Sequence, residues 1–373
     1  MKIAVNAQLL RKNDMYGMGW FAYNTLKHIV EQNPEVEFHF LFDSAIEDEF
    51  IFNTNVIAHH VKPKAKSIFL KIFWQQWSVR RKLREIKPDL FLSPDGSLCI
   101  GWNGKQYAVI HDINFFHNSS YLNWKARIYY NSFFPKFAKK ASRIGTVSTY
   151  SKLDIINAYG IAPDKIDVVY NGVNSFFTPV PEDETNKTKS ELTDGENYFI
   201  FIGSLQPRKN ILRLLQAFEL FKKRTKSPFK LVIAGKEMYK VSDIYTVYDG
   251  MMFKGDVIFT GRVPDEKINA VLGSAYAMVF VPLFEGFGIP VIEAMQCNVP
   301  VICSNVTSIP EVAGDAALLV DPYNVEQLSV AMGRIYRDDS LRCELIEKGK
   351  KQKTLFSWEN TANLLWNGIL ECL

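Results

Sequence analysis

The chain has 373 residues, enough for two domains of ordinary size, and 47% hydrophobic and 23% charged residues are typical of a globular protein. A net charge of +4 is too small to indicate a nucleic-acid-binding protein, so we expect no nucleic-acid partner. The sequence enters a strand-like run at Lys2 without a signal peptide, and it lacks an apolar stretch of roughly eighteen residues, so we expect a cytoplasmic protein.

The first half of the chain alternates strand-like and helix-like segments. Apolar runs predict strands at 2–7, 36–42, 56–61, 89–92, 106–110, 143–147 and 165–170. Segments at 17–31, 62–87 and 121–140 read as helical, and 148–151 caps a further helix. Strands separated by helices predict an α/β domain with a parallel sheet.

Two glycines, Gly17 and Gly19, open the first predicted helix. With Ala22 they fit the Gly-x-Gly-x-x-Gly/Ala pattern of dinucleotide-binding proteins. That pattern requires a glycine directly after the strand, whereas residues 10–16 intervene here, so we discount a dinucleotide-dependent oxidoreductase. The alternative to any binding role is that the two glycines belong to an ordinary loop before a helix.

The segment 62–87 is rich in both basic and aromatic residues. Such a helix is consistent with peripheral contact with the anionic inner face of a membrane. The alternative, which we favour, packs its apolar face on the sheet and leaves the charges in water.

The predicted strand 106–110 is followed by His111 and Asp112. A histidine at the carboxyl end of a parallel strand lies on the ligand-binding edge, where its imidazole can donate to a hydroxyl or exchange a proton. Asp112 either orients the imidazole ring or caps the next turn.

Residues 175–196 read as a linker between two domains. Pro179, Pro181 and a charged tract at 182–191 bury little and break regular structure. The second domain then alternates strands and helices, with strands predicted at 198–202, 231–234, 257–260, 277–283, 299–303 and 317–320. An amphipathic segment at 356–373 closes the sequence.

The first strand of the second domain leads to Arg208 and Lys209, which precede or open a helix. A guanidinium, an ammonium and free helix N–H groups together favour an anion site. The run lacks the second glycine and the Ser/Thr of a phosphate-binding P-loop, and a basic surface turn is the alternative.

The segment 277–303 reads as strand, glycine-containing loop, helix and strand. Glu285 lies in the loop and Glu293 about one turn into the helix, so both lie near the carboxyl end of the strand. Gly286 and Gly288 let a ligand approach the backbone closely. A tight turn with one solvated and one capping glutamate is the alternative on spacing alone.

The run Glu285 to Met295, EGFGIPVIEAM, resembles the Glu-x7-Glu motif of retaining glycosyltransferases of family 4, and the resemblance continues at 309–312 and 314–317. It implies the GT-B fold, in which two Rossmann-like, doubly wound parallel-sheet domains face each other across a cleft. The domains would span 1–174 and 197–354, joined by the linker 175–196. A C-terminal helix over 355–373 would cross back to the first domain, anchored by Trp358 and Trp366.

The resemblance also implies roles for site residues. His111 would lie near the transferred sugar, Arg208 and Lys209 would hold the donor diphosphate, and these three with Glu285 would be the catalytic residues. Glu293 would bind the ribose. The remaining donor-binding positions would be Gly17 and Gly19 beside the diphosphate, Val263 beside the base, and Gly286, Phe287, Gly288 and Ile289 beside the sugar.

The implied reaction moves a hexose from a nucleoside diphosphate sugar to a saccharide or lipid-linked saccharide in surface polysaccharide synthesis. We expect no cofactor and no metal, since the chain contains no Asp-x-Asp motif. The segments around Arg208 and His111 look most like mannosyltransferases, which favours GDP-mannose as donor and leaves UDP-glucose or another UDP-hexose open. The alternative enzyme is a nucleotide-sugar 2-epimerase of GT-B fold. A non-catalytic protein that only binds a sugar nucleotide is a further alternative, but it would not explain why a histidine stands at position 111.

Overall fold

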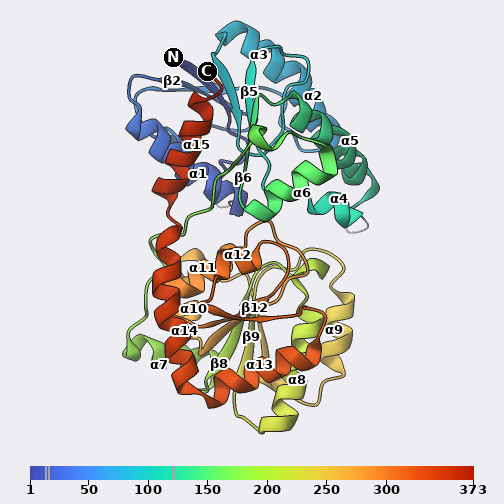
Figure 1. Cartoon of the computed structure of the whole chain (residues 1–373), viewed down its shortest axis with the longest axis vertical. Coiled ribbons are helices and arrows are strands. Elements are labelled where there is room, and N and C mark those ends of the chain that lie inside the picture. Colours follow the sequence, from blue (N-terminus) through green and yellow to red (C-terminus); the bar gives the residue numbers. More distant parts are fainter. Residues whose placement is uncertain (13–14, 16, 120–121) are drawn as a thin grey trace. The chain divides into compact units, whose positions relative to one another are not determined.

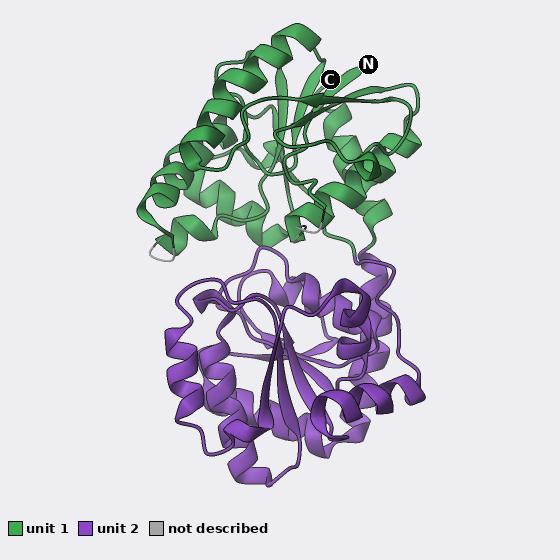
Figure 2. Ribbon diagram, turned by 180° about the vertical axis from the view of Figure 1, so that it is seen from behind, with its two compact units in different colours: residues 1–172, 357–373 green, residues 173–356 purple. Residues whose placement is uncertain are grey.

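The computed structural model of the chain describes residues 1–12, 15, 17–119 and 122–373. These residues form two compact units (Figure 2). Unit 1 contains Met1–Gly172 together with Ser357–Leu373, and unit 2 contains Val173–Phe356. The C-terminal segment therefore belongs to the same unit as the N-terminus.

Unit 1 is built on a parallel sheet with helices around it (Figure 1). Its described strands follow the order β3-β2-β1-β4-β5-β6-β7. The apolar β1 is buried apart from its first residue, as expected for a parallel sheet with helices on both faces. The predicted strands are confirmed, with boundaries that agree to within about two residues. The strands are β1 Lys2–Asn6, β2 Glu37–Phe42, β3 Val56–His60, β4 Leu90–Ser93, β5 Lys105–Val109, β6 Arg143–Thr146 and β7 Ile166–Val168.

The helices of unit 1 start where the sequence provides caps. Asn123 accepts a hydrogen bond from Ala126 N at the start of α5, and Ser148 accepts one from Ser151 N at the start of α6. The predicted helix 121–140 begins with Tyr121, which lies outside the described residues. The helices are α1 Gly17–Gln32, α2 Ile68–Phe73, α3 Val79–Ile86, α4 Asn114–His117, α5 Trp124–Lys140, α6 Thr149–Tyr159 and α15 Trp358–Leu370.

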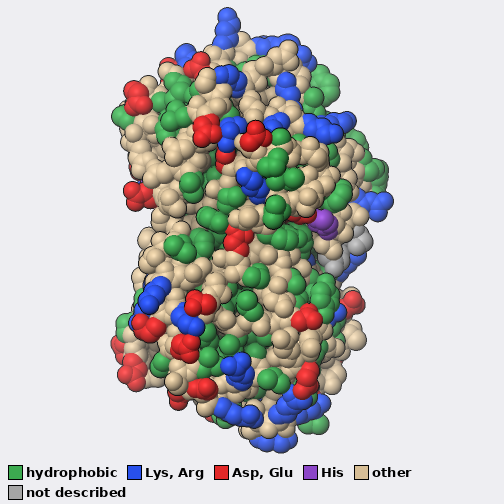
Figure 3. All heavy atoms as spheres, in the orientation of Figure 1, with side chains coloured by type: hydrophobic (Ala, Val, Ile, Leu, Met, Phe, Trp, Pro, Cys, Tyr) green, Lys and Arg blue, Asp and Glu red, His purple; other side chains and the backbone are tan. Residues whose placement is uncertain are grey.

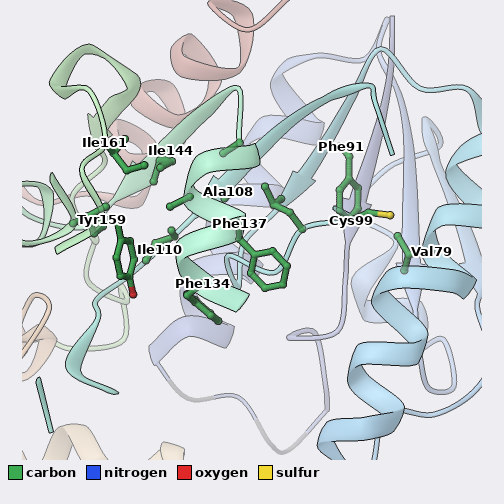
Figure 4. Packing of buried hydrophobic residues seen from close by; sticks show 14 of the residues in the cluster. Val79, Phe91, Cys99, Ala108, Ile110, Phe134, Phe137, Ile144, Tyr159 and Ile161 are labelled. Carbon is green, nitrogen blue, oxygen red and sulfur yellow. The ribbon is translucent and has the colours of Figure 1, made fainter. Parts of the chain in front are cut away.

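The core of unit 1 includes the packing of α5 against β5. Figure 4 shows Phe134 and Phe137 of α5 together with Ala108 and Ile110, from β5 and the residue just after it. All four are at most 5% exposed. This packing fixes the backbone immediately before His111.

The predicted helix over 62–87 consists of three consecutive pieces: α2, a π-helix at Trp74–Ser78 and α3. Two buried side chains of the π-helix anchor it to neighbouring backbone. Trp74 Nε1 donates to Val61 O at 2.7 Å, and Gln75 Nε2 donates to Ser97 O at 2.8 Å. The wider turn presents these side chains to the core, while other aromatic residues of the same segment stay exposed.

The C-terminal helix α15 packs against α1 in unit 1. Both tryptophans of this segment make aromatic contacts there: Trp358 lies edge-on to Phe21 at 6.3 Å, and Trp366 lies 6.4 Å from Phe38 between ring centroids. Thr361 Oγ1 donates to Tyr170 O at 2.6 Å. These contacts attach the C-terminal segment to unit 1, as the resemblance implies.

Unit 2 is built on a second parallel sheet, whose described strands follow the order β10-β9-β8-β11-β12-β13. The strands are β8 Tyr198–Ile202, β9 Lys230–Ala234, β10 Val257–Gly261, β11 Ala277–Phe280, β12 Val301–Ser304 and β13 Ala317–Val320. The helices after the first strand are α8 Ile211–Thr225, α9 Ser242–Asp249, α10 Asp265–Gly273, α11 Ile289–Gln296, α12 Ile309–Ala313, α13 Val325–Arg337 and α14 Asp339–Gln352.

The predicted linker 175–196 is wrong in one respect, because it contains a helix, α7 (Glu182–Thr193), within unit 2. The helix lacks an apolar stripe, and Thr193 is its buried residue. Acidic residues fill its first turn, where they interact favourably with the helix dipole, and Asp194 ends it in a left-handed conformation. The helix is therefore favoured by interactions at its two ends, and a pattern of hydrophobic residues does not reveal such interactions.

Candidate active site

The carboxyl edge of the unit 2 sheet is organised around the neighbouring strands β8 and β11. The chain runs outward from β8 to β9 and β10 on one side, then returns to β11 on the other. Ligands of doubly wound sheets bind at such a reversal of strand order. The loops after the two strands are joined by Leu283 N, which donates to Arg208 O at 2.8 Å, and by Asn210 Nδ2, which donates to Val281 O at 3.0 Å.

The loop after β8 is a 3-10 turn at Pro207–Lys209. It ends at Asn210, whose φ of +62° is a left-handed conformation that asparagine adopts more readily than most residues. The Asn210 side chain is buried and also donates to Pro322 O at 2.7 Å. Asn210 thereby fixes the turn that carries Arg208 and Lys209, which precede helix α8.

Arg208 and Lys209 form ion pairs with the same oxygen of Glu285. Arg208 Nη1 lies 2.5 Å and Lys209 Nζ lies 2.6 Å from Glu285 Oε1, and Arg208 Nη1 also donates to Phe284 O at 3.1 Å. Burial raises the pKa of the Glu285 carboxyl, but the charges of Arg208 and Lys209 outweigh it and hold that pKa below its ordinary value. Glu285 is therefore ionised at neutral pH, and the three groups together carry one net positive charge.

Glu293 lies in the second turn of α11 and differs from Glu285 in its electrostatic environment. Although part of the side chain reaches the surface, the surrounding protein atoms raise the pKa of its carboxyl to about 7, and the charge of Lys209 opposes this shift. In the described part of the chain no side-chain hydrogen bond to Glu293 is present. The structure thus brings Glu293 near the Lys209–Glu285 pair and leaves its oxygens available to a ligand.

The loop between Glu285 and α11 is held tightly in place. Gly288 has a φ of +105°, and a Cβ added there would lie 2.5 Å from Ile309 Cδ1, so only glycine fits without a shift. Ser308 Oγ lies 2.9 Å from Glu285 O and 3.0 Å from Phe287 O, which forms a three-centre hydrogen bond. These contacts fix the backbone of the predicted donor loop, including Gly286, up to the first helical residue, Ile289.

Val263 lies apart from this cluster along the same sheet. It follows β10, the edge strand, whereas the Arg208 loop follows β8, and β9 lies between the two strands. No hydrogen bond or ion pair connects Val263 to Arg208, Lys209 or Glu285 in the residues that the structure describes. Its predicted contact with the base of the donor stays a prediction.

Gly17 and Gly19 both lie in the first turn of α1, Gly17 exposed and Gly19 buried, so the helix predicted to open at these residues is confirmed. Their predicted place beside the donor diphosphate stays a prediction. A Cβ added to Gly19 would lie 3.1 Å from Met15 Cβ. Close packing of the chain before the helix therefore explains a small residue at position 19.

His111 lies just beyond β5 and is held by two contacts in unit 1. Its Nε2 lies 3.0 Å from Pro94 O, and its ring lies edge-on to Phe21 at 4.8 Å between centroids. Because a carbonyl oxygen only accepts, Nε2 carries the proton of the neutral ring and Nδ1 is the acceptor. Burial lowers the pKa of His111, which favours this neutral form. Asp112 Oδ1 accepts from Asn114 N, so it supports the following turn and does not orient the ring.

A polar cluster that was not predicted from the sequence lies at the carboxyl ends of β1 and β4, which are also neighbours across a reversal of strand order. Asp95 accepts hydrogen bonds from Asn6 Nδ2 at 2.9 Å and from Ser93 Oγ at 2.9 Å, and it pairs with Lys71 Nζ at 3.2 Å. The signal in the sequence was a polar turn, residues 93–97, directly after a buried strand.

The arrangement in unit 2 suits a ligand that carries both negative charge and hydroxyl groups. Two cations at one edge of the sheet bind an anion, and two carboxylates beside them accept hydrogen bonds from hydroxyls. The described residues contain no group of three or more histidine, cysteine, aspartate or glutamate side chains placed to hold a metal ion. None of the described helices is long and apolar enough to cross a bilayer.

Sequence models of two protein families match the chain. Residues 182–352 match the family described as glycosyl transferases group 1, and residues 15–175 match glycosyltransferase family 4. The first match contains the Arg208–Lys209–Glu285 cluster and Glu293, and the second contains His111. Together the two matches span most of the chain.

Several curated proteins are similar in sequence. O-antigen chain mannosyltransferase B of Escherichia coli is 34% identical over 253 residues, which are 68% of this chain and 66% of that protein. O-antigen chain mannosyltransferase RfbU of Salmonella typhimurium is 32% identical over 61% of this chain and 63% of that protein. The serotype-specific mannosyltransferase WbdA of Escherichia coli is 27% identical over 72% of this chain, which spans only 34% of its length.

Solved structures share the fold at low sequence identity. Sucrose-phosphate synthase from Thermosynechococcus elongatus superposes with a TM-score of 0.80 at 16% identity, with both chains covered completely. WaaG, a glycosyltransferase involved in lipopolysaccharide biosynthesis, has a TM-score of 0.75 at 13% identity over 97% of this chain and 98% of WaaG. Anabaena HepE in complex with UDP and glucose has a TM-score of 0.73 at 15% identity, again with both chains covered completely. The two Rossmann-like sheets are therefore those of the GT-B fold.

Proposed function

Because the chain belongs to the group 1 glycosyl transferases of glycosyltransferase family 4, we propose that it transfers a hexose from a nucleoside diphosphate sugar to a saccharide or lipid-linked saccharide hydroxyl. The transfer retains the configuration of the sugar, needs no metal ion and contributes to a surface polysaccharide. The observation that carries this proposal is the ion-paired cluster of Arg208, Lys209 and Glu285 at the β8–β11 edge.

The cluster supports a division of roles among its members. Breaking the bond between sugar and diphosphate leaves negative charge on the diphosphate, and Arg208 and Lys209 stabilise that charge directly. Glu285 and the backbone of the following loop bind the sugar hydroxyls. Glu293 accepts hydrogen bonds from the ribose, for which its oxygens are available. For His111 the proposed role is contact with the transferred sugar, where Nδ1 of the neutral ring accepts a hydrogen bond from a hydroxyl.

The donor we propose is GDP-mannose. Two relatives at 34% and 32% identity are named mannosyltransferases of the O-antigen chain, which supports mannose as the sugar and an O-antigen-type polysaccharide as the product. HepE has been solved with UDP and glucose, which keeps UDP-glucose as the second donor to test. The proposal includes a cytoplasmic location, with the acceptor reached at the inner face of the membrane.

The test is a donor screen followed by product analysis. The purified chain is incubated with GDP-mannose, UDP-glucose, UDP-galactose and UDP-N-acetylglucosamine, and thermal shift identifies the donors that stabilise it. We expect GDP-mannose to give the largest shift and, with a mannose-containing oligosaccharide acceptor, an α-linked product in the absence of added metal and in EDTA. An inverted product, or a reaction abolished by EDTA, would contradict the proposed chemistry. An epimerised sugar formed from donor alone would identify a 2-epimerase instead.

A further inference from the structure

A cavity of about 590 Å³ lies between α2 and α5 on unit 1, outside the residues assigned above. Three lysines line it, together with two aromatic side chains and the residue that caps α5. These residues are Lys66, Lys71, Lys125, Phe69, Trp124 and Asn123.

The lysines give the cavity a positive charge. Lys71 pairs with Asp95 at 3.2 Å and lies 5.8 Å from the centre of the Tyr129 ring, so one of the three charges is compensated. Lys125 Nζ lies 5.8 Å from the centre of the Phe69 ring and 5.4 Å from that of Trp124, above faces that attract a cation without neutralising it. Lys66 is exposed and makes no ion pair with any described residue. Two uncompensated charges around a cavity favour an anionic group.

Exposed aromatic side chains continue from the cavity along α2 and the π-helix. Phe69 is 66% exposed, Phe73 49% and Trp77 60%, at a spacing of four residues that places them on one side of the helix. Phe73 and Trp77 stack on each other at 5.7 Å between centroids. Figure 3 shows apolar and basic side chains together at the edge of unit 1 where Figure 1 places α2, α3 and α5. The favoured expectation for 62–87, in which the apolar residues pack inward, is therefore only partly correct.

The aromatic row, defined here as Phe69, Phe73 and Trp77, is flanked by further basic residues. Phe73 and Trp77 line a second hollow of about 550 Å³. This hollow is also lined by Arg80, Arg81 and Arg84 and by Glu85, which pairs with Arg81 at 3.1 Å. An apolar strip with cations at its side fits a ligand that is itself amphiphilic, with an anionic group at one end of an apolar chain.

The cavity is connected to His111 through a single loop of unit 1. Asp95, which holds Lys71, follows Pro94, whose carbonyl accepts the hydrogen bond from His111 Nε2. Asp95 also accepts from the Ser97 backbone at 2.9 Å, so the loop is rigid between the two contacts. Lys71, which lines the cavity, therefore reaches the same loop that holds His111 at the carboxyl edge of the sheet.

We propose that this cavity binds the diphosphate of a lipid-linked acceptor, whose apolar chain lies along the aromatic row while its sugar extends toward His111. The inference rests on the proposed function and narrows its acceptor from any saccharide to an anionic, lipid-linked one. A phospholipid bilayer shares the same chemistry of an anionic head on an apolar chain. The cavity favours the acceptor because one of the lysines that line it is fixed by Asp95 at the sheet edge.

The test measures binding of farnesyl diphosphate to the full chain by calorimetry, without donor and below the micelle concentration of the probe. The variant is Lys66→Ala/Lys125→Ala, which leaves the Lys71–Asp95 pair intact and therefore preserves the fold. Its matched control is Lys136→Ala/Lys139→Ala, which removes two exposed lysines from the other end of α5. We expect the cavity variant to weaken binding by about tenfold and the control by less than about twofold. Equal affinity in the two variants would overturn the proposal.

Two further probes separate the sources of the ligand. Inorganic pyrophosphate should bind more weakly than farnesyl diphosphate, and Phe69→Ser/Phe73→Ser should remove that difference if the chain lies on the aromatic row. Sedimentation with phosphatidylglycerol vesicles tests the bilayer: a cavity variant that loses vesicle binding but keeps its affinity for farnesyl diphosphate would overturn the proposal in favour of membrane contact. Transfer to a water-soluble acceptor by the wild-type chain tests the proposed function separately. Absence of that transfer contradicts the proposed function, whereas equal binding of farnesyl diphosphate by the two variants contradicts only this inference.

Discussion

Lys209 Nζ lies 2.6 Å from Glu285 Oε1, although the two residues follow different strands of the unit 2 sheet. Lys209 also lies 4.8 Å from the centre of the Phe280 ring, over the last residue of β11. The ammonium is thus held by a carboxylate and an aromatic face at the point where the strand order reverses. A buried ion pair of this kind is weak evidence for stability but strong evidence for a site that handles charge.

We expect Arg208→Ala/Lys209→Ala to lower kcat/KM for transfer by about 10²–10³, because the departing diphosphate loses its two cations. The measurement is the initial rate of transfer with the donor that the screen identifies. Glu285 is buried and loses both of its ion-pair partners in this variant, so circular dichroism checks that the variant remains folded. Lys223→Ala/Arg224→Ala, an adjacent and more exposed basic pair on α8, is the matched control. A double variant that keeps a rate near wild type would remove the diphosphate assignment.

Glu293 predicts a pH dependence of donor binding. The pKa of its carboxyl is about 7, above its ordinary value, so the carboxylate that accepts from the ribose becomes populated as pH rises through 7. Donor affinity should therefore increase between pH 6 and pH 8. Glu293→Gln, which accepts with a neutral oxygen, should bind about tenfold more weakly at pH 8 and show little change over this range. Calorimetry between pH 6 and pH 8 measures the donor affinity of both proteins. An identical pH dependence of affinity in wild type and Glu293→Gln would refute the ribose role.

Much of the fold and of the unit 2 site could be predicted because the signals are local. Short apolar runs mark the strands, and Arg208, Lys209, Glu285 and Glu293 each stand at a strand end or helix start, so the topology alone brings them to one edge. The ion pair between Lys209 and Glu285 was not predicted, because spacing along the chain does not report which side chains meet.

The parts that could not be predicted depend on tertiary contacts or on local end effects. Asp95 and Lys71 meet through the fold, and neither belongs to a recognised motif. The helix that contains Gly19 was predicted, but the close packing of Met15 against position 19 was not. The helix at Glu182–Thr193 has no apolar periodicity, so a pattern of hydrophobic residues could not reveal it.

His111 should be required for transfer but not for donor binding to unit 2. His111→Gln carries an amide nitrogen with about the reach of the imidazole Nε2, so it can donate to Pro94 O and preserve the loop, while the acceptor nitrogen Nδ1 is lost. We expect kcat to fall by about 10² and donor affinity to change by less than about twofold. Burial lowers the pKa of His111, so the ring is neutral above pH 6.5, and wild-type kcat measured at saturating donor should stay constant there. A variant with wild-type kcat would show that His111 serves structure alone.

Gly288 should be the least replaceable glycine of the donor loop. Gly288→Ala combines a φ of +105°, which side chains rarely adopt, with a Cβ only 2.5 Å from Ile309 Cδ1. We expect a loss of about 2–4 kcal/mol in the free energy of unfolding, measured by urea titration, and weaker donor binding because the loop backbone must shift. Gly255→Ala is the matched control, since its φ lies outside the left-handed range and no heavy atom lies within 4 Å of the added Cβ. If both variants changed the free energy by less than about 0.5 kcal/mol, the loop would be more adaptable than its contacts indicate, and the fixed geometry assigned to Glu285 would no longer follow from it.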